Sequence, residues 1–247
     1  MTAENGALAV IPARYASTRF PGKPLVSLLG RPMIAHVVAR ALEAACFDEV
    51  LVATDDERIA TAAAQAGARP VVTGPADSGT DRVAAAVRTE RAEIVVNLQG
   101  DEPAMPPGNL QALVWFLRRR PDVSIATLAL PGAAEDLADP DVVKVVCDLE
   151  GRALYFSRAG IPFQRRADAG IVRRHLGLYG FRREALLRFA ALPGCALEQT
   201  EGLEQLRALA HGMAIHVLDV KHPSVAVDVP GDIPRAEEAL RCIYAAR

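Results

Sequence analysis

A loop near the start of the chain carries three cationic side chains, Arg14, Arg19 and Lys23, with no acidic residue among them. It follows directly on the apolar run 8–12, which predicts a short buried strand. Ligands of α/β proteins bind outside the carboxyl ends of the strands, and arginine and lysine both bind phosphate oxygens. The loop therefore predicts a polyphosphate site. The alternative is a solvated basic turn, which we favour less because surface cations usually alternate with acids.

Two common phosphate-binding motifs are excluded by the residues of this loop. A dinucleotide-binding fold needs Gly-x-Gly-x-x-Gly after its first strand, whereas the loop holds a single glycine, Gly22. A P-loop needs a glycine five residues before its Gly-Lys pair and a Ser or Thr after it. This chain has Ser17 and Pro24 at those positions. The loop is therefore neither the fingerprint of a nicotinamide-dependent oxidoreductase nor that of a P-loop NTPase.

Two further polar groups follow predicted strands. Asp101 and Glu102 follow the predicted strand 93–98 after two intervening residues, and magnesium in nucleotide enzymes is typically held by one or two carboxylates plus substrate phosphates. This pair is a candidate magnesium or acid/base site, with an ordinary Gly-Asp turn as the alternative. Ser78-Gly79-Thr80 begins a predicted helix, where a hydroxyl can cap the helix and free N–H groups can bind a polar ligand.

Strands and helices alternate along the first 130 residues. This alternation predicts an α/β fold with a doubly wound, mostly parallel sheet. Beyond residue 130 a hairpin over 142–156, an arginine-rich irregular stretch and a strand over 175–181 predict an antiparallel excursion. We expect one domain over 1–247, with residues 1–130 and 212–247 forming the main nucleotide-binding sheet and 131–211 a smaller substrate and dimerisation subdomain. The predicted strands of the main sheet lie at 8–12, 49–54, 69–72, 93–98, 123–130 and 215–220.

Composition excludes several classes of protein. The 28 basic and 30 acidic side chains give a net charge of −2, which argues against a general nucleic-acid binder. No apolar run reaches the ~18 residues of a membrane span, and the first residues lack a signal-peptide pattern, so we expect a cytoplasmic protein without membrane contact. The four cysteines are scattered without Cys-x-x-Cys spacing, which indicates neither a zinc site nor a disulfide framework.

The motifs, taken together, resemble those of the sugar-acid cytidylyltransferases over nearly the full length of the chain. The strings Arg-His175-Leu-Gly-Leu-Tyr179-Gly and Leu-Glu204-Gln205-Leu-Arg point to the branch that acts on 3-deoxy-manno-octulosonate (Kdo). One departure is the stretch 223–227, Pro-Ser-Val-Ala-Val, where many members of this family have a glycine-rich approach to the last aspartate, Asp228. The other strings that carry the resemblance are Ile-Pro-Ala-Arg14-Tyr-Ala-Ser-Thr-Arg19, Pro-Gly-Lys23-Pro-Leu, Ser78-Gly-Thr-Asp-Arg82, Asn-Leu-Gln99-Gly-Asp101-Glu-Pro, Ala-Leu-Tyr-Phe-Ser-Arg158 and Val-Asp228-Val-Pro.

The resemblance implies a Rossmann-like nucleotidyltransferase that converts CTP and Kdo to CMP-Kdo and pyrophosphate with Mg²⁺, for lipopolysaccharide synthesis, as a homodimer. It implies catalytic roles for Arg14, Lys23 and Asp101, and metal ligation by Asp101 and Asp228. The nucleotide set is Pro12, Ala13, Arg14, Arg19, Lys23, Ser78, Gly79 and Gln99, and the sugar-acid set is Gln99, Arg158, Arg165, His175, Tyr179, Glu204 and Gln205.

Structural alternatives stand beside these roles. His175 and Tyr179 lie four apart on a predicted strand and therefore share a face, which fits a core with polar tips as well as a site. Glu204 and Arg207 fit an ion pair on a helix surface, and Asp228 fits a helix cap. At the level of function, the alternatives are a cytidylyltransferase for another sugar acid, such as a sialic acid or an amino-modified Kdo, and a non-catalytic nucleotide-binding protein.

Overall fold

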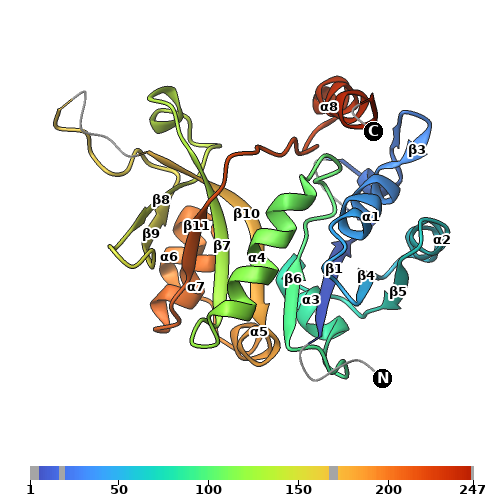
Figure 1. Ribbon diagram of the computed structural model, residues 1–247, viewed down its shortest axis with the longest axis horizontal. Helices are drawn as coiled ribbons and strands as arrows, with labels where there is room; N and C mark the ends of the chain where they lie inside the picture. Colours follow the sequence, from blue (N-terminus) through green and yellow to red (C-terminus); the bar gives the residue numbers. More distant parts are fainter. Residues whose placement is uncertain (1–5, 17–19, 167–171, 246–247) are drawn as a thin grey trace.

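A central, mostly parallel sheet forms the core of the protein, as seen in a computed structural model that describes residues 6–16, 20–166 and 172–245. Its strands lie in the order β11-β7-β10-β6-β1-β4-β5 (Figure 1). The parallel alternation confirms the predicted doubly wound fold. The strands are β1 (Ala7–Ala13), β4 (Glu49–Thr54), β5 (Arg69–Val72), β6 (Ile94–Asn97), β7 (Ile125–Pro131), β10 (Arg173–Arg182) and β11 (His216–Asp219).

Helices cover both faces of this sheet. Successive side chains of β1 point to opposite faces of the sheet, so that Ile11 packs in one buried cluster and Val10 in the other. Burial on both faces explains why the sequence of β1 is a continuous apolar run and does not alternate with polar residues. One face is covered by α1 (Met33–Glu43), α2 (Glu57–Gln65) and α4 (Pro107–Arg119), and the other by α3 (Gly79–Ala86), α5 (Arg183–Ala190) and α7 (Gln205–Ala210).

Strand β10 lies inside the main sheet. It pairs antiparallel with β6 on one side and β7 on the other, although the sequence placed it in the excursion over 131–211. The excursion is therefore continuous with the main sheet: β8 (Lys144–Cys147) pairs with β10, and β9 (Ala153–Ser157) pairs only with β8 among the described strands. Helices α5 and α6 (Ala196–Glu201) were not predicted.

The chain ends in a segment that crosses the top of the molecule. After β11, residues 220–232, here called the crossing segment, run to α8 (Ile233–Ala245), which lies over the hairpin β2 (Ser27–Leu28)–β3 (Arg31–Pro32) and α1 (Figure 1). Leu28, Met33 and Leu240 form part of a third buried cluster, which lies between these elements. No helix in the described part of the chain is long and apolar enough to span a membrane.

Candidate active site

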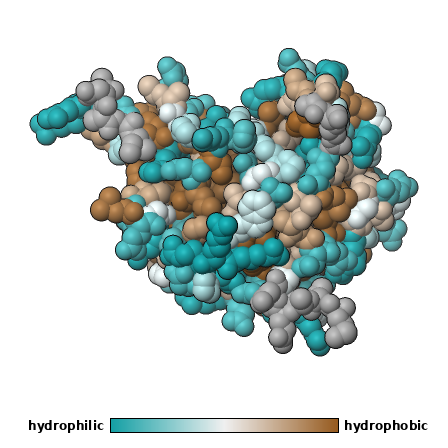
Figure 2. Space-filling view, in the orientation of Figure 1, coloured by the Kyte–Doolittle hydropathy of each residue, from teal (hydrophilic) through white to brown (hydrophobic). Residues whose placement is uncertain are grey.

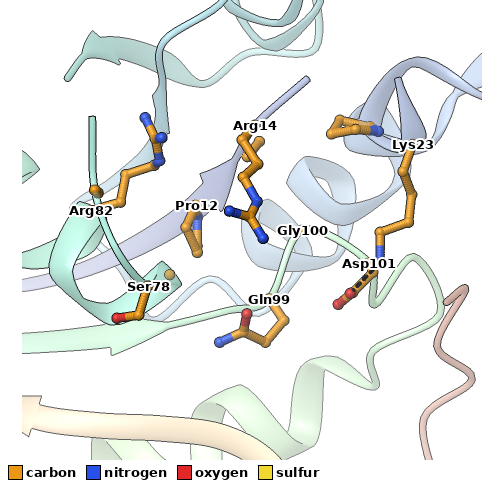
Figure 3. A pocket seen from close by; sticks show the side chains of 12 residues that line it. Pro12, Arg14, Lys23, Ser78, Arg82, Gln99, Gly100 and Asp101 are labelled. Carbon is orange, nitrogen blue, oxygen red and sulfur yellow. Dashed lines mark hydrogen bonds and ion pairs between the residues drawn. The ribbon is translucent and has the colours of Figure 1, made fainter. Parts of the chain in front are cut away.

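A first cavity, of about 200 Å³, opens where β1 and β6 end. The 3₁₀ turn at Lys23–Leu25, the start of α3 and the loop after β6 complete its walls (Figure 3). Parallel strands bring these segments together because their carboxyl ends meet at one edge of the sheet. The structure therefore assembles here most of the predicted nucleotide set, namely Pro12, Ala13, Arg14, Lys23, Ser78, Gly79 and Gln99, together with Asp101.

Lys23 lies between two carboxylates. Its Nζ donates a hydrogen bond to Asp101 Oδ2 at 2.6 Å and lies 3.6 Å from Asp228 Oδ1. The sequence placed Lys23 in a loop of unpaired cations, and this expectation was wrong, because its partners come from other loops, 78 and 205 residues further along the chain. The Lys23 side chain is mostly buried, with 16% exposed, whereas half of Asp228 is exposed.

Glycine is required at two positions of this site. Gly22 adopts a positive φ of 72°, its N–H donates to Tyr15 O at 2.9 Å, and a Cβ there would lie 3.1 Å from the Tyr15 ring. A Cβ on Gly100 would lie 2.7 Å from the carbonyl oxygen of Pro12. Only glycine therefore lets the loop after β6 approach the end of β1 this closely.

The start of α3 is capped as the sequence predicted. Ser78 Oγ accepts a hydrogen bond from the Asp81 N–H at 3.1 Å and donates to Asp81 Oδ2 at 2.8 Å. The hydroxyl of Ser78 is therefore used within the helix cap, and the backbone of the first turn of α3 faces the cavity at Gly79.

A second, larger cavity of about 850 Å³ adjoins the first. The surface is concave here, between the part of the molecule around β8 and β9 and the lobe formed by α8 (Figure 2). Gly79 and Gln99 line both cavities, so two ligands would meet at these residues. The walls include six of the seven predicted sugar-acid residues, Gln99, Arg158, His175, Tyr179, Glu204 and Gln205, together with Asp228.

His175 and Tyr179 stand side by side on β10, as their spacing predicted, with ring centroids 5.5 Å apart. Burial lowers the pKa of His175 to about 3 and raises the pKa of Tyr179 well above its usual value. Both side chains are therefore neutral near pH 7. Thr127 Oγ1 lies 3.0 Å from His175 Nε2, whereas the buried Tyr179 hydroxyl makes no hydrogen bond to another described residue.

A chain of hydrogen bonds connects the two cavities. Gln99 Nε2 donates to Asn97 Oδ1 at 3.2 Å, and Asn97 Nδ2 donates to Thr80 Oγ1 at 3.0 Å. The Thr80 hydroxyl then donates to Glu204 Oε1. Burial raises the pKa of Glu204, against the opposing effect of its hydrogen bonds. The network fixes Gln99 and Glu204 relative to one another before any ligand binds.

Arg158 is held by backbone carbonyls. Its Nε donates to Glu201 O and its Nη1 to Pro140 O, both at 2.9 Å. Arg158 forms no ion pair with any carboxylate in the described part of the chain, so its positive charge is available to an anionic ligand. Beneath it, the buried Lys144 donates to the carbonyls of Asp139, Val142 and Arg158 and thereby fixes the two segments that border the cavity.

Two predicted residues do not join the site. Arg19 lies outside the described residues, so its predicted contact with phosphate stays a prediction. Arg165 is exposed on the irregular stretch before β10 and lines neither cavity.

Two structural alternatives were wrong. Arg207 pairs with Glu198, its Nη2 lying 2.6 Å from Oε1, whereas Glu204 binds Thr80. The carboxylate that caps the turn before α8 belongs to Asp232, which accepts the N–H groups of Asp228 and Val229.

Sequence reasoning did not assign several residues that the structure places here. Arg82 lines the first cavity, with its guanidinium bound to Thr73 and Asp55. Arg174 lines the second cavity, and so does Glu102, which the sequence had already offered as half of a magnesium or acid/base pair. Arg174 directly precedes His175 in a recognised motif, which was the available signal. Burial raises the pKa of Glu102 to about 7, and the nearby Asp101 and Asp228 also raise it.

The donor set at Lys23 fits a magnesium ion. Asp101 and Asp228 supply carboxylate oxygens, the ligands that Mg²⁺ prefers, at the mouth of a cavity lined by cations. Within residues 6–16, 20–166 and 172–245 there is no group of three or more His, Cys, Asp or Glu side chains suited to a metal. A two-carboxylate site would therefore need further oxygens from a bound ligand.

Comparison with known proteins shows which family the chain is similar to. A family described as Cytidylyltransferase matches residues 8–215 of the chain. A 3-deoxy-manno-octulosonate cytidylyltransferase of Anaeromyxobacter dehalogenans (strain 2CP-1 / ATCC BAA-258) is 50% identical over 234 residues, which cover 94% of this chain and 96% of that protein. One of Nitratidesulfovibrio vulgaris (strain DP4) is 52% identical over 241 residues, with 94% and 95% covered.

A solved structure shares the fold. It is described as CMP:2-keto-3-deoxy-manno-octonic acid synthetase complexed with CTP, superposes with a TM-score of 0.93 and is 39% identical in sequence. The match covers 97% of this chain and 100% of that one. The similarity therefore extends over both cavities.

Proposed function

The chain belongs to the 3-deoxy-manno-octulosonate cytidylyltransferase family, and we propose that it transfers CMP from CTP to the anomeric 2-hydroxyl of Kdo, releasing pyrophosphate. The observation that carries this proposal is the pair of adjoining cavities that share Gly79 and Gln99. One is lined by cations and a helix start, and the other by an arginine and neutral hydrogen-bonding groups. The first lining suits a triphosphate, which carries several negative charges. The second suits a sugar acid, which carries one carboxylate and several hydroxyl groups.

The first cavity is suited to CTP. Arg14 and Lys23 supply positive charge for the phosphates, and the start of α3 presents backbone at Gly79. The Lys23 ammonium is held between Asp101 and Asp228, close to where the triphosphate would lie. We expect Arg19 to add a further contact with the triphosphate, as the family resemblance implies.

The second cavity is suited to Kdo. Arg158, bound to carbonyls alone, offers a charge for the carboxylate of the sugar acid. Gln99, Tyr179 and Gln205 offer neutral hydrogen-bonding groups for its hydroxyls. The Tyr179 hydroxyl in particular has no hydrogen-bond partner in the described part of the chain, and a substrate hydroxyl would satisfy it.

The reaction requires the 2-hydroxyl of Kdo to attack the α-phosphorus in line with the departing pyrophosphate. The adjoining cavities hold the two reactants against one another, which supplies the positioning on which phosphoryl-type transfer depends. The oxygen–phosphorus bond to Kdo forms as the bond to pyrophosphate breaks, the proton of the hydroxyl is released to solvent, and no covalent enzyme intermediate is needed. Lys23 and Arg14 neutralise charge that develops on the phosphate oxygens.

Mg²⁺ is the cofactor we propose, and Asp101 and Asp228 would hold it together with phosphate oxygens of CTP. When bound, it would neutralise the triphosphate and polarise the α-phosphate. Glu102 is close to both aspartates, but its Oε2 accepts the hydroxyl of Ser224.

We also propose that the enzyme is a cytoplasmic homodimer. All four cysteines are free thiols, which fits a reducing compartment. Among the described strands, β9 is an edge strand that carries the exposed Leu154, and the exposed Leu149 lies in the adjoining turn. Apolar side chains on an unprotected edge favour pairing with another chain.

Pyrophosphate release by the purified protein tests the proposed reaction. CTP, UTP, ATP and GTP are each supplied with Kdo and Mg²⁺, and the CTP reaction is repeated with N-acetylneuraminate in place of Kdo. We expect release only when CTP and Kdo are both present. Release with another sugar acid alone would keep the mechanism and change the substrate. Binding of CTP without release from any sugar acid would favour the non-catalytic alternative.

A further inference from the structure

The crossing segment carries Asp228 to the site and has little regular structure of its own. Residues 220–229 lie outside any helix or strand, so no ladder of backbone hydrogen bonds fixes the position of Asp228. Three groups of contacts hold the segment instead. Its apolar side chains pack against the hairpin β2–β3, where Val227 is fully buried, and its polar groups contact the loop 98–106. At its end, Asp232 Oδ2 accepts the N–H of Asp228 at 2.9 Å.

Three hydrogen bonds connect the crossing segment to the loop after β6 and to the helix that follows it. The Val227 N–H donates to Asp101 O at 2.9 Å. Asn109 Nδ2 donates to the carbonyl oxygen of His222 at 2.9 Å. The Ser224 hydroxyl donates to Glu102 Oε2, which adds a side-chain to side-chain hydrogen bond between the crossing segment and the loop after β6.

These contacts place the two candidate metal ligands opposite one another. Glu102 directly follows Asp101, and Ser224 lies four residues before Asp228. The Ser224–Glu102 and Val227–Asp101 hydrogen bonds therefore join the two segments at two points next to the candidate metal ligands. The resulting arrangement is seen at Lys23, whose Nζ contacts both Asp101 and Asp228. Glu102 and Ser224 are both partly buried, so leaving this bond unmade would cost free energy.

We propose that Ser224 and Glu102 are positioning residues, whose hydrogen bond holds the crossing segment so that Asp228 and Asp101 can bind one divalent cation. This inference rests on the proposed function in one respect, namely that Asp101 and Asp228 bind the cation. Glu102 acts here through the hydrogen bond that its oxygen accepts and is not itself a metal ligand.

Three variants separate this role from a direct one. Ser224→Ala removes the donor, and Glu102→Ala removes the acceptor. Glu102→Gln keeps an oxygen that accepts the Ser224 hydroxyl but removes the negative charge, so it should behave like the wild type if the hydrogen bond is what matters. Ser124→Ala is the matched control, since Ser124 is exposed at the amino end of β7, away from both cavities.

The first measurement uses the protein without metal or nucleotide. Hydrogen exchange of the Val227 amide, followed by NMR or on peptides covering 224–229, reports how firmly the crossing segment is held. We expect exchange to be about tenfold faster in Ser224→Ala and Glu102→Ala, because the hydrogen bond that ties the crossing segment to the loop after β6 is lost. Glu102→Gln, Ser124→Ala and the amides of β6 should exchange as in the wild type.

The second measurement is Mn²⁺ binding in the presence of CTP, followed by electron paramagnetic resonance. We expect the dissociation constant to rise about tenfold in Ser224→Ala and Glu102→Ala and to stay near the wild-type value in Glu102→Gln. Unchanged exchange or unchanged Mn²⁺ affinity in Ser224→Ala would overturn the proposal. So would a Glu102→Gln variant as impaired as Glu102→Ala. Neither readout needs turnover, so a failure of the proposed reaction is distinguishable from a failure of this inference.

Discussion

At the scale of single residues, the contacts of Lys23 are central to the account. The ammonium lies between Asp101 and Asp228, at the mouth of the cavity that we assign to CTP. Sequence reasoning identified all three residues and expected Asp101 and Asp228 to share a metal ion, but it placed Lys23 on the triphosphate. Their contact depends on loops that are 78 and 127 residues apart along the chain, from Lys23 to Asp101 and from Asp101 to Asp228, and no local pattern encodes it.

Loss of the charge of Lys23 or of Asp101 should reduce catalysis without unfolding the protein. We expect Lys23→Ala and Asp101→Asn each to lower turnover by about a hundredfold or more, since each removes charge stabilisation at the reacting phosphate. Steady-state kinetics of pyrophosphate release measures the loss, and circular dichroism checks the fold. Asp122→Asn is the control, because Asp122 is an exposed carboxylate paired with Arg120. Near-normal turnover in both site variants would contradict the assignment.

His175 makes folding stability depend on pH. Burial lowers its pKa from 6.5 to about 3, so between these values the unfolded chain binds a proton that the folded chain does not. Stability contributed by the neutral imidazole is therefore present above pH 6.5 and is lost as pH falls. Relative to His175→Gln, we expect the wild type to lose about 1 kcal/mol of unfolding free energy between pH 6.5 and 5.5. Urea denaturation at the two pH values measures this difference, and a constant difference would show that His175 titrates normally.

At the scale of elements, the loop after β6 depends on its close approach to β1. Gly100→Ala would place a Cβ 2.7 Å from the backbone oxygen of Pro12, and neither strand end can move away cheaply. We expect the loop to shift and carry Gln99 and Asp101 with it, which lowers turnover about a hundredfold.

A second glycine provides the matched control for that substitution. Gly108, in the first turn of α4, has nothing within 4 Å of its Cβ position, so Gly108→Ala should leave turnover unchanged and stability equal or up to about 1 kcal/mol higher. Kinetics and thermal unfolding of the two variants test this contrast. Equal activity in both would mean that the loop tolerates the extra atom.

Most elements were predictable because their local signals agree. Arg69–Val72 and Glu49–Thr54 are apolar or β-branched runs between turn residues, and the structure has both strands with the predicted bounds. Asp56 accepts the N–H of Arg58 at 2.9 Å and thus caps α2, and Asp is a residue type favoured at this position. The place of β10 was not predictable, because its partners β6 and β7 are chosen by long-range packing and not by its own periodicity.

The candidate site was predictable where its residues belong to recognised motifs. Motif positions such as His175 and Glu204 line the second cavity as expected. Asn97 and Thr80 were missed because each looks like an ordinary residue of a strand end or a helix start, and only the fold joins them into the network that holds Glu204. Arg165 differs from these residues, since its charge fits the expected ligand but it is exposed and lines neither cavity, so its role stays a prediction.

At the scale of the whole molecule, the proposed homodimer gives a further prediction. Leu154 is 62% exposed on the edge strand β9, and Leu149 is fully exposed beside it. We expect the wild type to sediment as a dimer and Leu154→Lys to shift toward the monomer, because a buried lysine at an interface core is unfavourable. Analytical ultracentrifugation over a range of concentrations measures this. A wild-type monomer at all concentrations would rule out the dimer, and a dimer that persists in Leu154→Lys would place its interface elsewhere.

The central claim is that one site joins two substrates through the 2-hydroxyl of Kdo, and tracing that oxygen tests it most directly. Kdo labelled with ¹⁸O at the 2-hydroxyl is incubated with CTP, Mg²⁺ and the enzyme, and the products are followed by ³¹P NMR. We expect the label to appear in the oxygen between Kdo and the phosphorus of CMP-Kdo, while the pyrophosphate stays unlabelled. Label in the pyrophosphate, or CMP-Kdo whose bridging oxygen is unlabelled, would contradict it.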